Sequence, residues 1–233
     1  MTLQPSVPVA ADDPDSTFSL SHASSFWGGT GVMDFILKTL GESSALGMRV
    51  RGSYGTFQTG FTEAQSQDDG TSQVDDLGSL SSNILEIVGD LYYLQQISPS
   101  LLIDIYAGAE MIRLTIAENT KYTGNEYLNG RFGIGGAYRV DTEFQLRVHA
   151  GALAVFSADN SGGAFGSSPL SWGAEAGAQL SFELFDGVQA ILDYTFRFLQ
   201  PTFPTPAPQA RVNVATESLE VMHTGGVLLG LTF

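Results

Sequence analysis

The chain has 233 residues, and 25 acidic against 10 basic side chains give it a formal net charge of −15 at pH 7. A surface this acidic repels the phosphate backbone of nucleic acid, and the absence of cysteine excludes disulfides, thiolate metal sites and a cysteine nucleophile. Only 15% of the residues are charged, against roughly 25% in ordinary soluble domains. A soluble protein would cover its surface poorly with so few charges, so the composition requires another explanation.

The N-terminal region is the part of the chain with the weakest pattern. Residues 1–16 are rich in Pro, Asp and Ser and are predicted to be disordered. They lack the basic and apolar regions of a signal peptide, so we expect a mature N-terminus. Thr30 is placed to cap a short helix over 31–40. The alternative is a hairpin of strands 17–26 and 32–39.

From residue 45 onward, apolar and polar residues alternate with period two, which predicts β-strands rather than helices. No run of 18 apolar residues occurs, as a transmembrane helix would need. Strands of a membrane β-barrel need only ~9–11 residues each. Eight alternating runs are found, at 46–54, 85–93, 103–111, 128–140, 144–156, 170–184, 188–198 and 219–233.

The connections between these strands alternate between long and short. The long ones include 58–82, 157–169 and 200–216, and the short ones are 95–100, 141–142 and 186–187. Bacterial outer-membrane barrels have short turns on the periplasmic side and long loops on the outside. The alternation therefore favours a transmembrane up-and-down barrel of eight strands, or ten if the N-terminal hairpin forms.

The apolar face of the strands carries large aromatic residues near the strand ends, as expected of girdles at two membrane interfaces. A soluble barrel would turn its apolar face inward and its charged face to water. The other face of these strands mixes glycine with charged residues, which suits a polar lumen. The predicted girdle consists of Tyr54, Tyr93, Tyr138, Phe144, Phe156, Trp172, Phe182 and Phe198.

The predicted lumen face carries charges of opposite sign on neighbouring strands. An eight-stranded barrel is just wide enough for side chains to fill, and an unpaired buried charge is costly, so we expect ion pairs that close the lumen. A narrow gated pore is the alternative. The expected network consists of Arg49, Arg51, Glu86, Asp90, Asp104, Glu110, Arg131, Arg139, Arg147, His149, Glu175, Glu183, Asp193 and Arg197.

The last nine residues alternate in the same way and end on an aromatic residue, with Val227, Leu229 and Leu231 before Phe233. This segment resembles the C-terminal strand signature of bacterial outer-membrane β-barrels, and 45–233 resembles the small OmpA/OmpX-like class in strand number and loop asymmetry. The resemblance implies a monomer in the outer membrane of a Gram-negative bacterium. It also implies contact with lipid and lipopolysaccharide, and recognition by the barrel-assembly machinery. Residues 1–44 would then lie in the periplasm or plug the lumen.

Signals for catalysis are weak, so we expect no enzyme, no cofactor and no metal site. Some eight-stranded outer-membrane barrels modify lipid A with a histidine, but His149 falls in mid-strand on the lumen face and His223 on the apolar face. The third histidine is His22, and the acidic stretch DDG…VDD lacks the spacing of an EF-hand. The sequence predicts an envelope-structural or surface-interaction role through the acidic loops. A narrow channel for small solutes is second, and a lipid A-modifying enzyme third.

Overall fold

A computed structural model describes residues 6–8, 17–21, 27–66, 72–117, 124–141, 143–159, 171–185, 188–200 and 220–231. These residues form β-strands and turns, and none of them lies in a helix. No helix in this part of the chain could therefore cross a membrane. The strands are β1 (Ser6–Pro8), β2 (Thr17–Ser21), β3 (Trp27–Thr39), β4 (Ser44–Ser66), β5 (Ser72–Ser98), β6 (Leu101–Ile116), β7 (Gly124–Arg139), β8 (Phe144–Asp159), β9 (Ser171–Phe185), β10 (Val188–Gln200) and β11 (Glu220–Leu231).

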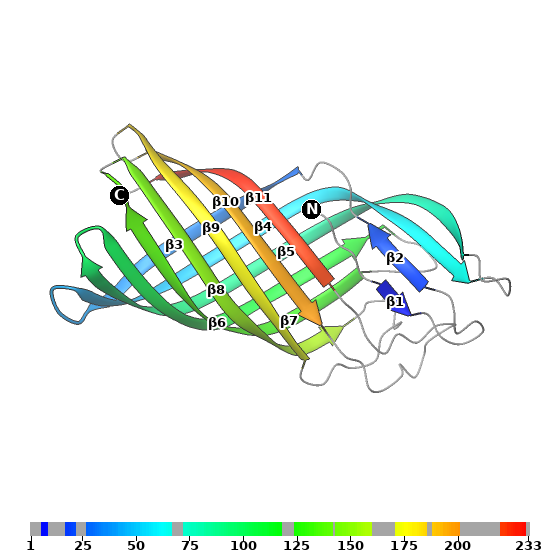
Figure 1. Cartoon of the computed structure of the whole chain (residues 1–233), viewed down its shortest axis with the longest axis horizontal. Coiled ribbons are helices and arrows are strands. Elements are labelled where there is room, and N and C mark those ends of the chain that lie inside the picture. The colour runs from blue at the N-terminus through cyan, green and yellow to red at the C-terminus, as the bar shows by residue number, and fades with distance from the viewer. Residues whose placement is uncertain are drawn as a thin grey trace.

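Nine antiparallel strands, β3 to β11, follow one another in an up-and-down order and form a single sheet with β1 and β2. The sheet is strongly curled, and its strands lie oblique to the long axis of the molecule (Figure 1). The short turns and the C-terminus lie at the same end of the barrel-like body. The prediction of an all-β, antiparallel up-and-down fold is confirmed.

Alternation of side chains gives the curled sheet an inner and an outer face. On β6 the buried residues include Asp104, Tyr106 and Glu110, whereas Ile105 between them is 48% exposed. Residues on the neighbouring strand β5 alternate in the same way, since Asp90 is buried and Leu91 is 60% exposed. We call the face with the buried residues the inner face and the opposite one the outer face.

The strand count is where the prediction was wrong. Residues 27–39, which include most of the expected helix, form the strand β3, and β3 pairs with β4 from Trp27↔Thr56 to Thr39↔Ala45. The alternative hairpin was also wrong, since β2 pairs with β4 further along, from Thr17↔Ala64 to Ser21↔Gly60. β2 and β3 therefore flank one edge of β4 in succession. Nine long strands replace the expected eight, and no N-terminal helix or plug is present among the described residues.

The first long connection is shorter than predicted. β4 continues to Ser66 and β5 begins at Ser72, so most of 58–82 belongs to paired strands. The polar composition of this region suggested a loop, but ladder hydrogen bonds join backbone groups and do not depend on apolar side chains. The hairpin extends beyond β6, whose pairing with β5 begins at Ser82↔Ile116.

The two edges of the barrel-like body are β3 and β11. In the described part of the chain no ladder joins them, so the sheet is a curled half-barrel rather than a closed one. The curl is tight enough for inner side chains of distant strands to touch, because Arg197 on β10 contacts Glu86 on β5. The interior between these strands contains the candidate site.

Candidate functional site

The centre of the interior is built around Arg197 on β10. Its Nη2 atom lies 2.8 Å from Glu86 Oε1 on β5, 2.9 Å from Glu110 Oε2 on β6 and 3.7 Å from Glu175 Oε2 on β9. The side chains of Arg197 and Glu110 are 6% and 0% exposed. Arg51 on β4 adds a second cation, at 2.8 Å from Glu86 Oε1. Ion pairs therefore join five strands, β4, β5, β6, β9 and β10, which are not all neighbours in the sheet.

A second cluster surrounds Arg131 on β7. One of its terminal nitrogens lies 3.3 Å from Asp90 Oδ2 on β5, and the other contacts Glu175 on β9. The Tyr106 hydroxyl donates a hydrogen bond of 3.0 Å to the same carboxylate oxygen of Glu175, and the Arg131 guanidinium lies over the Tyr106 ring. Glu175 thus joins the Arg131 cluster to the Arg197 cluster.

A third layer lies nearer the short turns. Arg147 on β8 contacts Asp104 on β6 at 2.5 Å, and Arg49 on β4 contacts Asp34 on β3 at 2.5 Å. The Tyr92 hydroxyl on β5 donates a hydrogen bond to the other oxygen of Asp34. This layer is less buried than the centre, with the side chains of Arg147 and Arg49 22% and 26% exposed.

Sequence reasoning missed four polar members of these clusters, which are Asp34, Tyr92, Tyr106 and Asn129. Asp34 was missed because its segment was assigned to a helix. Each tyrosine lies two residues after a predicted inner carboxylate, Tyr92 after Asp90 and Tyr106 after Asp104. Because residues two apart in a strand share a face, the alternation pattern could have identified both. Asn129 is buried and donates its amide to Glu110 Oε1 at 2.8 Å.

Glycines on the inner face make room for the large side chains. A Cβ atom on Gly133 would lie 2.3 Å from the Tyr106 hydroxyl, and one on Gly47 would lie 2.2 Å from the Tyr92 ring. One on Gly135 would lie 2.4 Å from Asp104. Glycine at these positions has a steric cause, since the Tyr92, Tyr106 and Asp104 side chains each lie across a glycine of a neighbouring strand.

An apolar layer fills the interior towards the end opposite the short turns. Tyr127, Val155 and Leu199 are each at most 2% exposed, and the aliphatic residues around them are also buried. Side chains pack this end of the interior as they pack a protein core. The buried members of this apolar layer are Phe57, Ile112, Leu114, Ile116, Tyr127, Leu153, Val155 and Leu199.

The remaining members of the predicted network lie outside these clusters. Arg139 and Glu183 are exposed near the short turns, and neither forms an ion pair with any described residue. Asp193 is half-buried and likewise has no ion pair in the described part of the chain. His149 is half-buried, and a Cβ atom on Gly177 would lie 2.2 Å from its ring.

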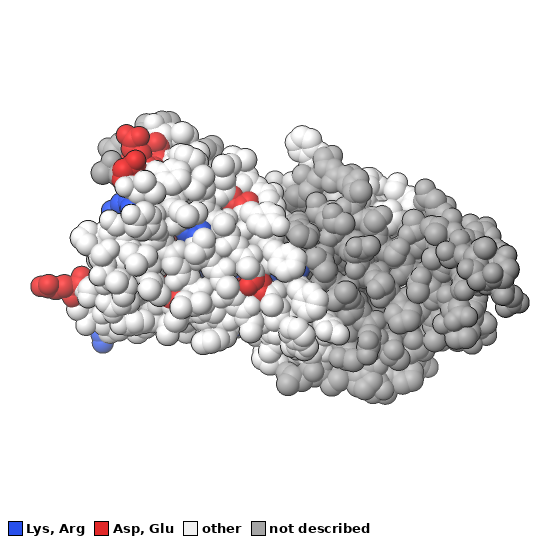
Figure 2. Space-filling model, in the orientation of Figure 1, with Lys and Arg blue, Asp and Glu red and all other residues white. Residues whose placement is uncertain are grey.

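The outer face is apolar over most of its area. Many large strand residues on it are exposed, as are Leu91 (60%), Phe132 (64%) and Val148 (50%). In the part of Figure 2 that is not grey, charged residues are few away from the end with the short turns. This distribution is the reverse of that in soluble proteins, in which charged side chains are rarely buried unless they are paired.

The predicted girdle residues lie at the two ends of the outer face. Phe144 and Phe182 pack edge to face near the short turns, with ring centroids 5.0 Å apart. Trp172 and Phe198 lie 5.4 Å apart near the other end. The exposed members are Tyr54 (53%), Tyr138 (51%), Phe156 (59%), Trp172 (59%) and Phe182 (36%), while Tyr93, Phe144 and Phe198 are half-buried.

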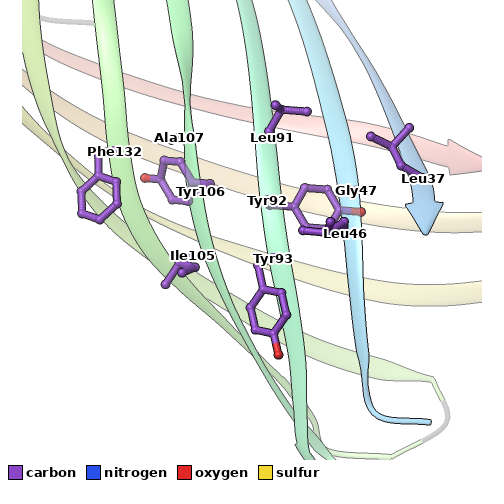
Figure 3. A pocket seen from close by; sticks show the side chains of 10 residues that line it. All are labelled: Leu37, Leu46, Gly47, Leu91, Tyr92, Tyr93, Ile105, Tyr106, Ala107 and Phe132. Atoms are coloured by element: carbon purple, nitrogen blue, oxygen red, sulfur yellow. The ribbon is translucent and has the colours of Figure 1, made fainter. Parts of the chain in front are cut away.

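A groove of about 320 Å³ interrupts this apolar surface. Leu91, Ile105 and Phe132 border it, and the small residues Gly47 and Ala107 leave the space between them. In Figure 3 the Tyr92 ring extends from β5 across β4 at Gly47. The lining residues are glycine, aliphatic and aromatic, and none of them is charged.

Several predicted features lie outside the described residues. Phe233 and the side chains of Leu229, Leu231, His22 and His223 belong to this set, whereas Val227 on β11 is 73% exposed. No group of three or more potential metal ligands occurs in the described ranges. Comparison with protein families and with curated proteins found no matching family model and no matching protein.

Proposed function

We propose that the protein is an outer-membrane β-barrel whose lumen is closed and which acts in the envelope through the connections at one end. The observation that carries this proposal is the inverted arrangement of the sheet, with ion pairs buried inside and large apolar side chains exposed outside. Monomeric soluble proteins rarely expose apolar patches larger than a few hundred Å². Lipid is the solvent in which such an outer face is stable.

The filling of the interior supports a lumen blocked by side chains rather than a channel. Ion pairs occupy the middle, around Arg197 and Arg131, and the apolar layer occupies the end opposite the short turns. Small barrels have interiors that side chains can fill, whereas barrels of 16 or more strands leave a channel. The alternative function, a narrow channel for small solutes, needs a continuous path through the interior. In this proposal the interior offers no such path.

The orientation follows from the short turns, which we assign to the periplasmic side. The connections at the other end then face the outside, together with the extended β4–β5 hairpin and the β1–β2 pair. Loops carry function because they tolerate variation on a rigid scaffold. We further propose that the protein is a monomer without a catalytic role. Its partners are lipopolysaccharide and outer-membrane lipid, and β11 directs its assembly.

Two measurements test it. The purified protein should stay monodisperse only in detergent, because the outer face would associate in water; a monodisperse monomer in plain buffer would refute the membrane assignment. In planar bilayers we expect no reproducible openings. Openings that change with Arg49→Ala or Glu110→Ala would instead establish the channel function, since both residues belong to the interior clusters.

A further inference from the structure

The interior contains a small polar cavity between the Arg131 cluster and the layer near the short turns. Its volume is about 60 Å³, and its lining includes four arginines, Arg49, Arg51, Arg131 and Arg147. Asp90 is the one carboxylate of the lining. A buried water needs roughly 10–15 Å³, so the cavity holds about four waters or one small polyatomic ion.

Unpartnered buried atoms lie on the side chains that line this cavity. The Nε atoms of Arg51 and Arg131 have no hydrogen-bond partner, and neither has Oδ1 of Asp90. The side chain of Arg131 is only 5% exposed. An unsatisfied buried donor or acceptor is costly, so a bound water or ion in the cavity would stabilise these atoms.

Three of the four arginines are held by carboxylates outside the cavity lining, whereas Arg131 contacts Asp90 within the lining and Glu175 outside it. Asp34 binds Arg49, Glu86 binds Arg51, and Asp104 binds Arg147. These contacts orient the guanidinium groups while their other N–H groups remain for a further acceptor. A cation would face four guanidinium groups and a single carboxylate, so the lining selects against it.

From this geometry we infer that the cavity is a binding site for a small inorganic oxyanion. Its oxygen atoms would accept hydrogen bonds from the Nε atoms of Arg51 and Arg131, and a hydroxyl group of the protonated oxyanion would donate a hydrogen bond to Asp90 Oδ1. A halide lacks such a proton. The anion enters from the short-turn end, where Arg49 and Arg147 are partly exposed, because the apolar layer blocks the other end.

Thermal unfolding in detergent tests the site with inorganic phosphate as the probe and chloride at the same ionic strength as the comparison. We expect a saturable rise of Tm with phosphate beyond that with chloride, since a ligand of the folded state stabilises it by mass action. An equal rise with both salts would overturn the inference.

A charge-neutral pair of substitutions locates the effect. Arg147→Gln with Asp104→Asn removes one cavity arginine together with its partner and should raise the phosphate concentration for half-maximal stabilisation at least tenfold. The matched control, Arg113→Gln with Glu126→Gln, removes an exposed ion pair outside the cavity lining and should leave that concentration unchanged. Unchanged phosphate stabilisation in the cavity variant would refute the site.

Should the cavity variant fail to fold, crystals of the unsubstituted protein grown with phosphate decide the question. We expect tetrahedral density within hydrogen-bond distance of the Nε atoms of Arg51 and Arg131. Density for water alone in the cavity would overturn the inference.

Discussion

Several charges in the interior are stabilised by more than one partner. Glu175 contacts Arg131 and Arg197 and accepts a hydrogen bond from Tyr106. Removing one partner from such a cluster costs more than the pair itself contributes, because the remaining charges stay buried without compensation. Single substitutions in the interior should therefore have large effects, and similar substitutions on the exposed surface small ones.

Arg197→Met provides the sharpest test of this difference. It leaves Glu86 without one of its two cations and Glu110 without the cation that it contacts, and we expect the free energy of unfolding to fall by about 3–5 kcal/mol. The matched control is Arg113→Met, which removes an exposed pair with Glu126 and should cost about 0–1 kcal/mol. Denaturant unfolding in detergent measures both; equal losses would contradict a buried network.

Gly133→Ala tests the steric role of the inner glycines. The new Cβ atom would lie 2.3 Å from the Tyr106 hydroxyl and 2.5 Å from the backbone oxygen of Ala150, so either the ring or the strand must move. We expect a loss of about 1–3 kcal/mol in unfolding free energy. Gly52→Ala, whose Cβ atom would meet nothing within 4 Å, should cost nothing. A neutral Gly133→Ala would show that the ring does not lie across this glycine.

At the scale of elements, β3 differs most from its neighbours, because all of its residues are exposed. Its register places Met33 opposite Val50 on β4. The chain contains no cysteine, so Met33→Cys with Val50→Cys creates a unique pair of thiols. A short bifunctional thiol reagent should join the two in good yield, since directly opposite Cβ atoms lie ≈ 4.5–5.5 Å apart.

The control for this cross-link is Met33→Cys with Leu91→Cys, which places the second thiol on β5 beyond β4. Its yield should be much lower than that of the first pair. Equal yields, or none in the first pair, would contradict the register of β3 and restore the possibility of a helix over 31–40.

Most of the strands could be predicted from the sequence because period-two alternation reports one buried and one exposed face. β6 and β10 follow it closely, and so do the inner charges that lie on them. The alternation breaks down in β3, where Phe35, Ile36 and Leu37 are consecutive and all exposed. A strand with apolar residues on both faces cannot be told from a helix by its sequence pattern, because period-two alternation arises only where one face is buried.

The partners within the interior could not be predicted in the same way. Parity assigns Arg197 and Glu86 to the inner face, but their contact joins β10 to β5 and depends on how tightly the sheet curls. Similarly, the extension of β4 and β5 into a polar region depends on backbone pairing, as in Glu63↔Asp75, which residue types do not encode. Alternation in the sequence thus predicts on which face of the sheet a side chain lies. The contacts between side chains depend in addition on the curvature of the sheet and on the pairing of its strands.

For the whole molecule, the decisive property is which solvent meets the outer face. In water, replacing an exposed apolar residue by a charged one is close to neutral or favourable. In lipid the same change is costly in the middle of the sheet and cheap near its ends. The position dependence of a charged substitution therefore distinguishes a membrane barrel from a soluble one without any assumption about activity.

Phe132→Arg places a charge in the middle of β7, at a residue that is 64% exposed. In phospholipid vesicles we expect the free energy of unfolding to fall by about 2–4 kcal/mol. Val140→Arg, just beyond the end of the same strand and 56% exposed, is the control and should cost about 0–1 kcal/mol. Denaturant titrations followed by the fluorescence of Trp27 and Trp172 would measure both variants. If Phe132→Arg is as well tolerated as Val140→Arg, the outer face does not meet lipid, and the proposed location in the membrane is wrong.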